Sequence, residues 1–182
     1  MPLAILISLF IFFEDYGTVI FMQRRIGLNQ QPFTLYKFRS MTNNKNLPNG
    51  SFEAGDQSRV TKIGKLLRKT KIDEFPQLIN VLSGKMSLVG PRPEVKKWVD
   101  MYPQQWAVVL TVKPGLTDNA SILFRNEEEL LSKVSNPAMH YKEVILPRKL
   151  SLYSEYIKNQ SFIGDLKIIL KTLYSISKKQ NV

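Results

Sequence analysis

The 182-residue chain contains no cysteine and only one histidine. The lack of cysteine excludes disulfide bonds, thiolate zinc sites and cysteine nucleophiles. His140 has no second histidine or thiol to complete a metal site, so it is interpreted as incidental. No G-x-G-x-x-G or Walker motif is present, which leaves Rossmann and P-loop nucleotide binding without support. These absences direct attention to the carboxylates and the cations of the chain.

Long apolar runs are also scarce. Pro2 to Phe13 is apolar except for Ser8, and Glu14 and Asp15 end the run. A bilayer span needs about 20 apolar residues, whereas shorter runs are typical of re-entrant or interfacial segments. A signal peptide is not indicated, because no basic segment precedes the run and no small-residue cleavage site follows it. A buried core helix remains the alternative.

Positive charge is concentrated in one third of the chain. Residues 23–71 hold 11 Lys and Arg against 2 Asp and Glu, so this segment carries +9 of the formal net charge of +11. Such a field indicates an anionic partner, which can be nucleic acid, a phosphorylated small molecule or an anionic membrane surface.

Two adjacent carboxylates, Asp73 and Glu74, separate a basic helical segment (59–71) from an apolar one. The pattern predicts a helix with Asp73 as N-cap and Pro76 in the first turn. Phe75, Leu78, Ile79 and Leu82 would form its apolar stripe. A carboxylate pair among cations suits phosphate chemistry, in which one acid attacks or shuttles a proton and the other holds a metal. The alternative is an ordinary helix cap.

Four cations are candidates for phosphate contacts. Lys37 and Arg39 lie two residues apart in a predicted strand (33–41), so they would share a face as an anion clamp or as two solvated charges. Arg68 ends the basic helix, where it either favours the helix dipole or turns toward a phosphate beside Asp73. Arg92 lies between Pro91 and Pro93, and this rigid turn suits bidentate phosphate recognition.

The remaining pattern predicts a mixed α/β, mostly helical fold. A β-hairpin joins strands at 19–23 and 33–41, and residues 42–58 read as a loop. Residues 96–112 look helical with an interruption at Pro103, and residues 113–117 read as a turn. The last helix has one apolar face, which either packs on the core or lies in a membrane interface. Its members are Phe162, Leu166, Ile169, Leu170, Leu173 and Ile176.

Taken together, these segments resemble the bacterial sugar transferase family, the monotopic polyprenyl-phosphate phosphoglycosyltransferases. The order and spacing agree over about residues 1–118 and again over 150–175. Single motifs are weak, but the ordered set is specific. The matching stretches are residues 19–27, 33–41, 58–68, 72–82, 84–94 and 161–169.

The resemblance implies transfer of a sugar 1-phosphate from a UDP-sugar to undecaprenyl phosphate, the first membrane step of surface polysaccharide or glycan synthesis. Asp73 would be the nucleophile that forms a covalent phosphosugar–aspartate, and Glu74 would bind Mg²⁺. Lys37, Arg68 and Arg92 match family positions that line the phosphate site. No nucleic acid is implied, and the oligomeric state stays open between a monomer and a homodimer.

The resemblance also implies a monotopic protein at the bacterial inner membrane, with the catalytic domain on the cytoplasmic face. Family members begin with a re-entrant helix bent at a Ser-Pro, where this chain has Met1 and Pro2. We therefore expect residues 1–16 to be part of a truncated re-entrant helix, or the start to be misassigned. Residues 17–182 would form the single catalytic domain, with amphipathic helices at the membrane interface.

Departures from the family pattern leave the sugar and the nucleotide undefined. Lys85 replaces a usual acidic residue, Tyr153 replaces an aspartate, and Thr117 to Ser121 replaces Thr-Gly-Trp-Ala-Gln. Two other hypotheses are retained. One is an inactive truncated membrane-associated paralogue. The other is a basic nucleic-acid-binding module, which is disfavoured because aromatic residues are not interleaved with the basic run.

Overall fold

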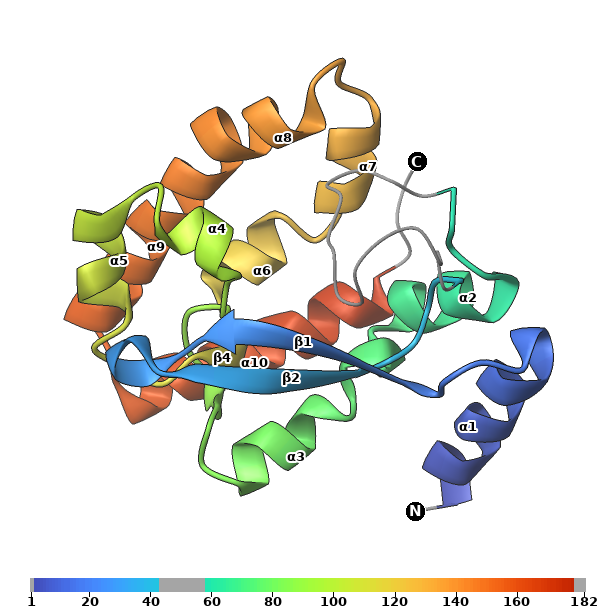
Figure 1. Cartoon of the computed structure of the whole chain (residues 1–182). Helices are drawn as coiled ribbons and strands as arrows, with labels where there is room; N and C mark the ends of the chain where they lie inside the picture. The colour runs from blue at the N-terminus through green and yellow to red at the C-terminus, as the bar shows by residue number, and fades with distance from the viewer. Residues whose placement is uncertain (1, 43–57, 179–182) are drawn as a thin grey trace.

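The computed structural model describes residues 2–42 and 58–178, where helices far outnumber strands (Figure 1). The mixed α/β, mostly helical fold predicted from the sequence is therefore confirmed. Residues 43–57, most of the predicted loop, and Met1 lie outside the described residues. The α-helices are α1 (Pro2–Asp15), α2 (Lys62–Thr70), α3 (Gln77–Leu82), α4 (Lys96–Val99), α5 (Pro103–Val109), α6 (Asn119–Leu123), α7 (Glu127–Ser132), α8 (Pro137–His140), α9 (Leu146–Lys158) and α10 (Phe162–Ser177). Short 3-10 turns form η1 (Leu28–Gln30) and η2 (Ile72–Glu74), and η3 (Tyr141–Ile145) is π-helical.

The predicted β-hairpin is present. Strand β1 (Ile20–Ile26) pairs antiparallel with β2 (Pro32–Phe38), in a register that places Phe21 opposite Lys37. Phe33 and Leu35 of β2 are buried and pack with Met86, which follows α3. The hairpin thus lies across the molecule and carries Lys37 toward the 3-10 turn η2 (Figure 1).

A second sheet was not predicted. Strand β3 (Ser87–Val89) pairs in parallel with β4 (Gly115–Thr117), so the predicted turn at 113–117 is wrong over its last three residues. Three-residue strands are too short to show alternation in sequence, and this pairing is non-local. The backbones of Gly90 and Gly115 touch, because a Cβ on Gly115 would lie 2.1 Å from the Gly90 nitrogen. This contact packs the Pro-Arg-Pro turn against β4.

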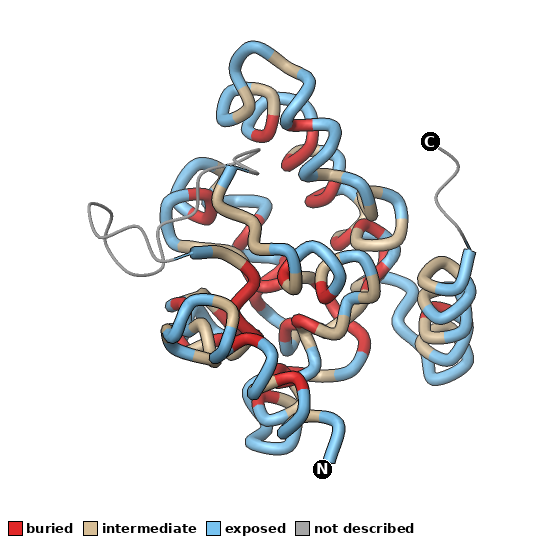
Figure 2. The backbone as a smooth tube through the Cα atoms, turned by 90° about the vertical axis from the view of Figure 1, so that its right-hand side faces the viewer, coloured by how far each residue is buried: buried red, intermediate tan, exposed pale blue. Residues whose placement is uncertain are grey.

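The main core lies among the C-terminal helices. It is built on Trp98, Trp106, Tyr141, Ile145, Leu146 and Leu150, with further buried residues from α6, α7 and α9. Figure 2 shows buried residues in the middle of the molecule, whereas α10 stands at one side with most of its residues exposed. Only Ile168 of α10 is buried, and it packs with Val89 and Tyr156.

Helix α1 packs on the end of the hairpin and on α2. Its buried residues Ile7 and Ile11 contact Phe38 and Leu67. The Glu14 carboxylate accepts a hydrogen bond from the Ile63 amide at 3.1 Å, near the start of α2. In residues 2–42 and 58–178, no helix has both the length and the apolar character that a membrane crossing requires.

The predicted helix start at Asp73 is wrong in detail. Asp73 lies inside the 3-10 turn η2 and caps no helix, and α3 begins at Gln77 after Pro76. The stripe residues Phe75, Ile79 and Leu82 are exposed, with Leu82 at 88%. The buried side of α3 is polar, because the side chain of Asn80 bonds to the β2 backbone: its amide group donates to the Thr34 carbonyl at 2.8 Å, and its oxygen accepts from the Tyr36 amide at 3.2 Å.

Candidate active site

The Asp73-Glu74 pair is positioned by an abrupt change of backbone direction. Lys71 ends α2 in the left-handed conformation with φ 59°, and the 3-10 turn η2 follows at once. Asp73 is only 6% exposed. Within the part of the chain that the structure describes, its Oδ1 atom is buried and has no hydrogen-bond partner. A buried, unpaired carboxylate oxygen is costly to keep, and such groups gather at functional sites.

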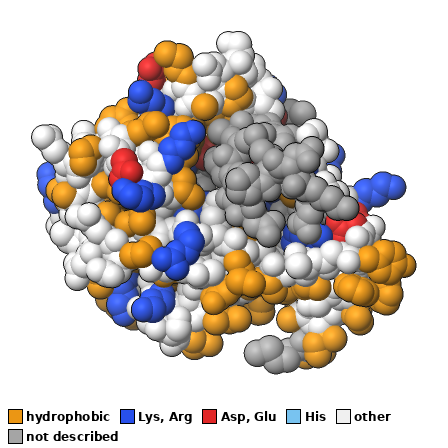
Figure 3. Space-filling view, in the orientation of Figure 1, with side chains coloured by type: hydrophobic (Ala, Val, Ile, Leu, Met, Phe, Trp, Pro, Cys, Tyr) orange, Lys and Arg blue, Asp and Glu red, His pale blue; other side chains and the backbone are white. Residues whose placement is uncertain are grey.

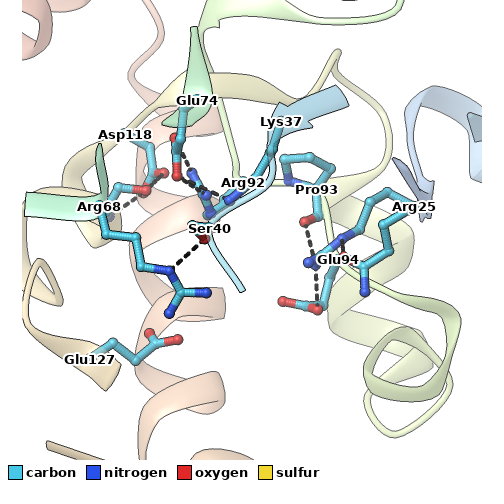
Figure 4. A network of polar contacts seen from close by, with 12 residues as sticks. Arg25, Lys37, Ser40, Arg68, Glu74, Arg92, Pro93, Glu94, Asp118 and Glu127 are labelled. Atoms are coloured by element: carbon cyan, nitrogen blue, oxygen red, sulfur yellow. Dashed lines mark hydrogen bonds and ion pairs between the residues drawn. The ribbon is translucent and has the colours of Figure 1, made fainter. Parts of the chain in front are cut away.

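Glu74 is held by two cations from distant elements (Figure 4). Lys37 of β2 donates to Oε1 at 3.2 Å. Arg92 of the Pro-Arg-Pro turn donates to Oε2 at 3.1 Å and to Oε1 at 2.5 Å, which is a bidentate pair. The structure thus brings Lys37, Glu74 and Arg92 together, in line with the single phosphate site that the family resemblance implies.

The two carboxylates have pKa values displaced in opposite directions. Burial raises the pKa of Asp73, and Lys37 opposes this only in part. Burial would raise the pKa of Glu74 too, but Arg92 and Lys37 outweigh it and hold that pKa well below its usual range. Burial lowers the pKa of Lys37, with Glu74 in opposition. Glu74 is therefore a fixed anion, whereas Asp73 keeps its proton to a higher pH than an ordinary aspartate.

The turn that carries Arg92 is anchored by residues that sequence reasoning missed. Glu94 accepts hydrogen bonds from Arg25 Nη1 at 2.8 Å and from the Tyr141 hydroxyl at 2.8 Å. Arg25 also donates to the Pro93 carbonyl at 3.1 Å. The position of Glu94 beside the rigid turn is a signal that could have indicated its role. Tyr141 gave no such signal, because it reaches Glu94 from the π-helical segment η3.

Arg68 lies beside the site but contacts other residues. Its Nε donates to the Ser40 hydroxyl at 2.8 Å, and its Nη1 donates to Glu128 at 2.7 Å. Helix α2 approaches Ser40 very closely, because a Cβ on Gly64 would lie 2.0 Å from the Ser40 carbonyl oxygen. The charge of Arg68 still favours the ionised form of Asp73.

Arg39 is not part of this cluster. It is 5% exposed and forms an ion pair with Asp15 at the end of α1, and its guanidinium lies directly over Gly17. Lys37 pairs with Glu74 instead. The two side chains therefore do not form a single anion clamp in this structure, and neither is simply a solvated charge.

Asp118 is a further buried carboxylate near the site. It is 1% exposed and caps α6 by accepting from the amides of Ala120 at 2.6 Å and Ser121 at 3.0 Å. Its charge also favours the ionised form of Arg92, beside Glu74. A helix-capping pattern in the sequence could have indicated the local role but not the proximity to Arg92.

Comparison with known proteins decides the family. A family model described as "Bacterial sugar transferase" matches residues 1–179. The chain belongs to the bacterial sugar transferase family. The protein is therefore a transferase. The match extends from helix α1 to the end of α10.

Three relatives show how similar the chain is to known sugar transferases. "Uncharacterized sugar transferase EpsL" of Bacillus subtilis (strain 168) is 40% identical over 158 residues, or 87% of this chain and 69% of the relative. The "UDP-N-acetylgalactosamine-undecaprenyl-phosphate N-acetylgalactosaminephosphotransferase" of Aeromonas hydrophila is 35% identical over 178 residues, which cover 96% of this chain and 39% of the relative. The "UDP-glucose:undecaprenyl-phosphate glucose-1-phosphate transferase" of Caulobacter vibrioides (strain ATCC 19089 / CIP 103742 / CB 15) is 34% identical over 184 residues, which cover 99% of this chain and 64% of the relative. The chain thus spans less than two thirds of the length of the second and third of these relatives, whose names specify a UDP-sugar.

Proposed function

We propose that the protein transfers a sugar 1-phosphate from a UDP-sugar to undecaprenyl phosphate. The observation that carries this proposal is the buried Asp73, whose Oδ1 has no hydrogen-bond partner among the described residues, beside a Glu74 held by Lys37 and Arg92. The names of the relatives support the substrate classes, since two of them combine a UDP-sugar with undecaprenyl phosphate.

In the proposed reaction, a carboxylate oxygen of Asp73 attacks the sugar-linked phosphorus of the donor. The bond from that phosphorus to the bridging oxygen breaks, and UMP leaves with the electron pair. Undecaprenyl phosphate then attacks the same phosphorus, which releases the Asp73 carboxylate and forms the lipid-linked diphosphate sugar. Arg92 and Lys37 lie where they can exchange Glu74 for phosphate oxygens and stabilise the charge that spreads over them.

Mg²⁺ is part of the proposal, and the residues present fit it. Mg²⁺ is usually bound through one or two carboxylates plus substrate phosphates. Asp73 has a buried oxygen without a hydrogen-bond partner in the described part of the chain, and Glu74 is adjacent. In residues 2–42 and 58–178 there is no cluster of three or more His, Cys, Asp or Glu that would form a complete protein site, so substrate phosphate would supply further ligands. When bound, the ion neutralises diphosphate charge.

We also propose that the protein lies on the cytoplasmic face of a membrane with apolar helix faces in the interface. The supporting observation is the exposed apolar surface. In Figure 3, hydrophobic side chains gather along the lower side of the molecule, where Figure 1 places α1 and α3. The exposed residues include Leu3, Leu6, Phe10 and Phe13 of α1, Phe75, Ile79 and Leu82 around α3, and Phe162, Ile163, Leu166, Leu170 and Leu173 of α10.

Part of the charge of the basic segment (residues 23–71) has an internal explanation. Four of its cations form ion pairs with carboxylates of the same chain, in the pairs Arg25–Glu94, Lys37–Glu74, Arg39–Asp15 and Arg68–Glu128. This pairing favours a phosphate site and a folded framework over a nucleic-acid surface, on which cations would face the solvent.

The test is a donor screen with the purified full-length chain, Mg²⁺ and undecaprenyl phosphate. UMP release from one UDP-sugar, with intact-mass detection of a phosphosugar adduct when the lipid is omitted, is the expected result. Asp73→Asn should abolish both signals, and Glu74→Gln should impair release and alter its Mg²⁺ dependence. Wild-type turnover in Asp73→Asn would refute the nucleophile assignment. No release from any donor would favour the inactive paralogue.

A further inference from the structure

Arg68 differs from Lys37 and Arg92 in the carboxylate that it contacts. Lys37 and Arg92 both bind Glu74, whereas Arg68 binds Glu128, 60 residues further along the chain in α7. In Figure 4 the side chain of Arg68 runs past Ser40 and away from Glu74. Arg68 is thus held outside the Glu74 cluster, although it lies in the last turn of α2, directly before the 3-10 turn that carries Asp73.

The contact between Arg68 and Glu128 is easy to break. The side chains are 23% and 49% exposed, and the paired atoms lie 2.7 Å apart. An ion pair this open to solvent is weak, because water and salt screen it. A diphosphate offers more negative charge and can bind a guanidinium through two oxygens. It can therefore displace the single carboxylate while Ser40 still holds the Arg68 Nε.

Helix α7 itself is anchored independently of Arg68. Glu127 forms an ion pair with Lys149 at 2.5 Å, and the Lys149 side chain is only 7% exposed. The Lys149 ammonium also lies 5.0 Å from the centre of the Tyr141 ring. Glu128 is thus kept next to Arg68 by its neighbour, whether or not the Arg68 contact is formed.

We propose that Glu128 sets the affinity for the donor by competing with the donor diphosphate for Arg68. This inference rests on the proposed function. Glu128 acts through Arg68 and touches no reacting atom, so it is a positioning residue. Glu128→Gln should lower the KM for the UDP-sugar by about two- to fivefold, the range expected for a weak ion pair, and leave kcat unchanged. Arg68→Gln should remove the effect of Glu128→Gln.

The matched control is Glu129→Gln. Glu129 lies in the same turn of α7 and pairs with the exposed Lys133 at 2.6 Å, so this change alters the net charge identically without touching Arg68. Donor kinetics of the full-length chain would be compared with calorimetric binding of inorganic pyrophosphate, with and without Mg²⁺. Thermal unfolding checks that each variant is folded.

Tighter pyrophosphate binding and a lower donor KM in Glu128→Gln but not in Glu129→Gln would support the competition. Equal changes in both variants would show a general charge effect and overturn it. Weaker binding in Glu128→Gln would also overturn it, because Glu128 would then order Arg68 for the donor. If no UDP-sugar yields UMP, the proposed function fails, but the pyrophosphate measurement still decides the role of Glu128.

Discussion

Asp73 and Lys37 have pKa values that burial moves toward each other. Burial raises the pKa of Asp73 and lowers the pKa of Lys37. The proposed attack requires an ionised Asp73 and a protonated Lys37. We therefore expect kcat/KM for UMP release to rise with pH through the raised pKa of Asp73. It should fall again through the lowered pKa of Lys37, so the profile is a bell that is narrower than the ordinary pKa values of Asp and Lys would give.

Lys37→Arg isolates the alkaline side of this profile. A guanidinium does not lose its proton in the accessible pH range, so the decline assigned to Lys37 should disappear in the variant, whatever its maximal rate. An alkaline limb that stays at the same pH in Lys37→Arg would assign the limb to another group.

The buried Asp73 should also lower the free energy of unfolding at neutral pH. A group whose pKa is raised in the fold stabilises it fully only below the pKa of the unfolded chain, and that contribution is lost as pH rises through the folded value. At neutral pH the wild-type chain has a buried carboxylate with one oxygen that no described residue hydrogen-bonds, whereas Asp73→Asn carries no charge there. We expect Asp73→Asn to have the higher Tm at neutral pH, with the difference shrinking in acid. A lower Tm throughout would contradict the burial argument.

At the scale of single elements, local sequence patterns predicted which helices and strands form better than they predicted which face of each element is buried. The hairpin, the basic helix α2 and the last helix all form where periodicity placed them. Of the predicted stripe, Phe75, Ile79 and Leu82 are exposed and Leu78 is half-buried, because periodicity cannot say whether an apolar face meets a core or another apolar phase. The hydrogen bonds of Asn80 with the backbone of β2 turn the polar side of α3 inward. They join segments that are far apart in the sequence, so a local pattern cannot show them.

The site shows the same division. Lys37, Glu74 and Arg92 meet, which the family resemblance implied but their residue types and spacing alone did not. The supporting contacts of Glu94 with Arg25 and Tyr141 could not be predicted, because they join segments up to 69 residues apart. The short parallel pair β3–β4 was missed for the same reason.

The ion pair of Arg39 with Asp15 joins α1 to the hairpin and can be tested separately from catalysis. Asp15→Asn would leave the buried guanidinium uncompensated, which costs about 3–5 kcal/mol when both groups are fully buried. Because the Asp15 side chain is 24% exposed, we expect a smaller loss of about 1–3 kcal/mol in denaturant unfolding. The donor KM should not change.

Arg39→Met tests the alternative that Arg39 binds phosphate. With the structural role, this variant loses stability, and its effect combines less than additively with that of Asp15→Asn. A raised donor KM with unchanged stability would instead restore Arg39 to the phosphate site.

At the scale of the whole molecule, the exposed apolar residues of α1, α3 and α10 support the proposed contact with a lipid surface. Leu82 and Leu170 are 88% and 57% exposed. Burying a leucine side chain is worth about 1.5–3 kcal/mol. Leu82→Asp or Leu170→Asp should therefore weaken co-sedimentation with anionic vesicles by about tenfold or more. Met139→Asp on α8 is the control, since Met139 is 52% exposed but lies outside the three apolar helices. Equal losses in all three variants would show that added negative charge, and not the apolar faces of α3 and α10, controls the binding.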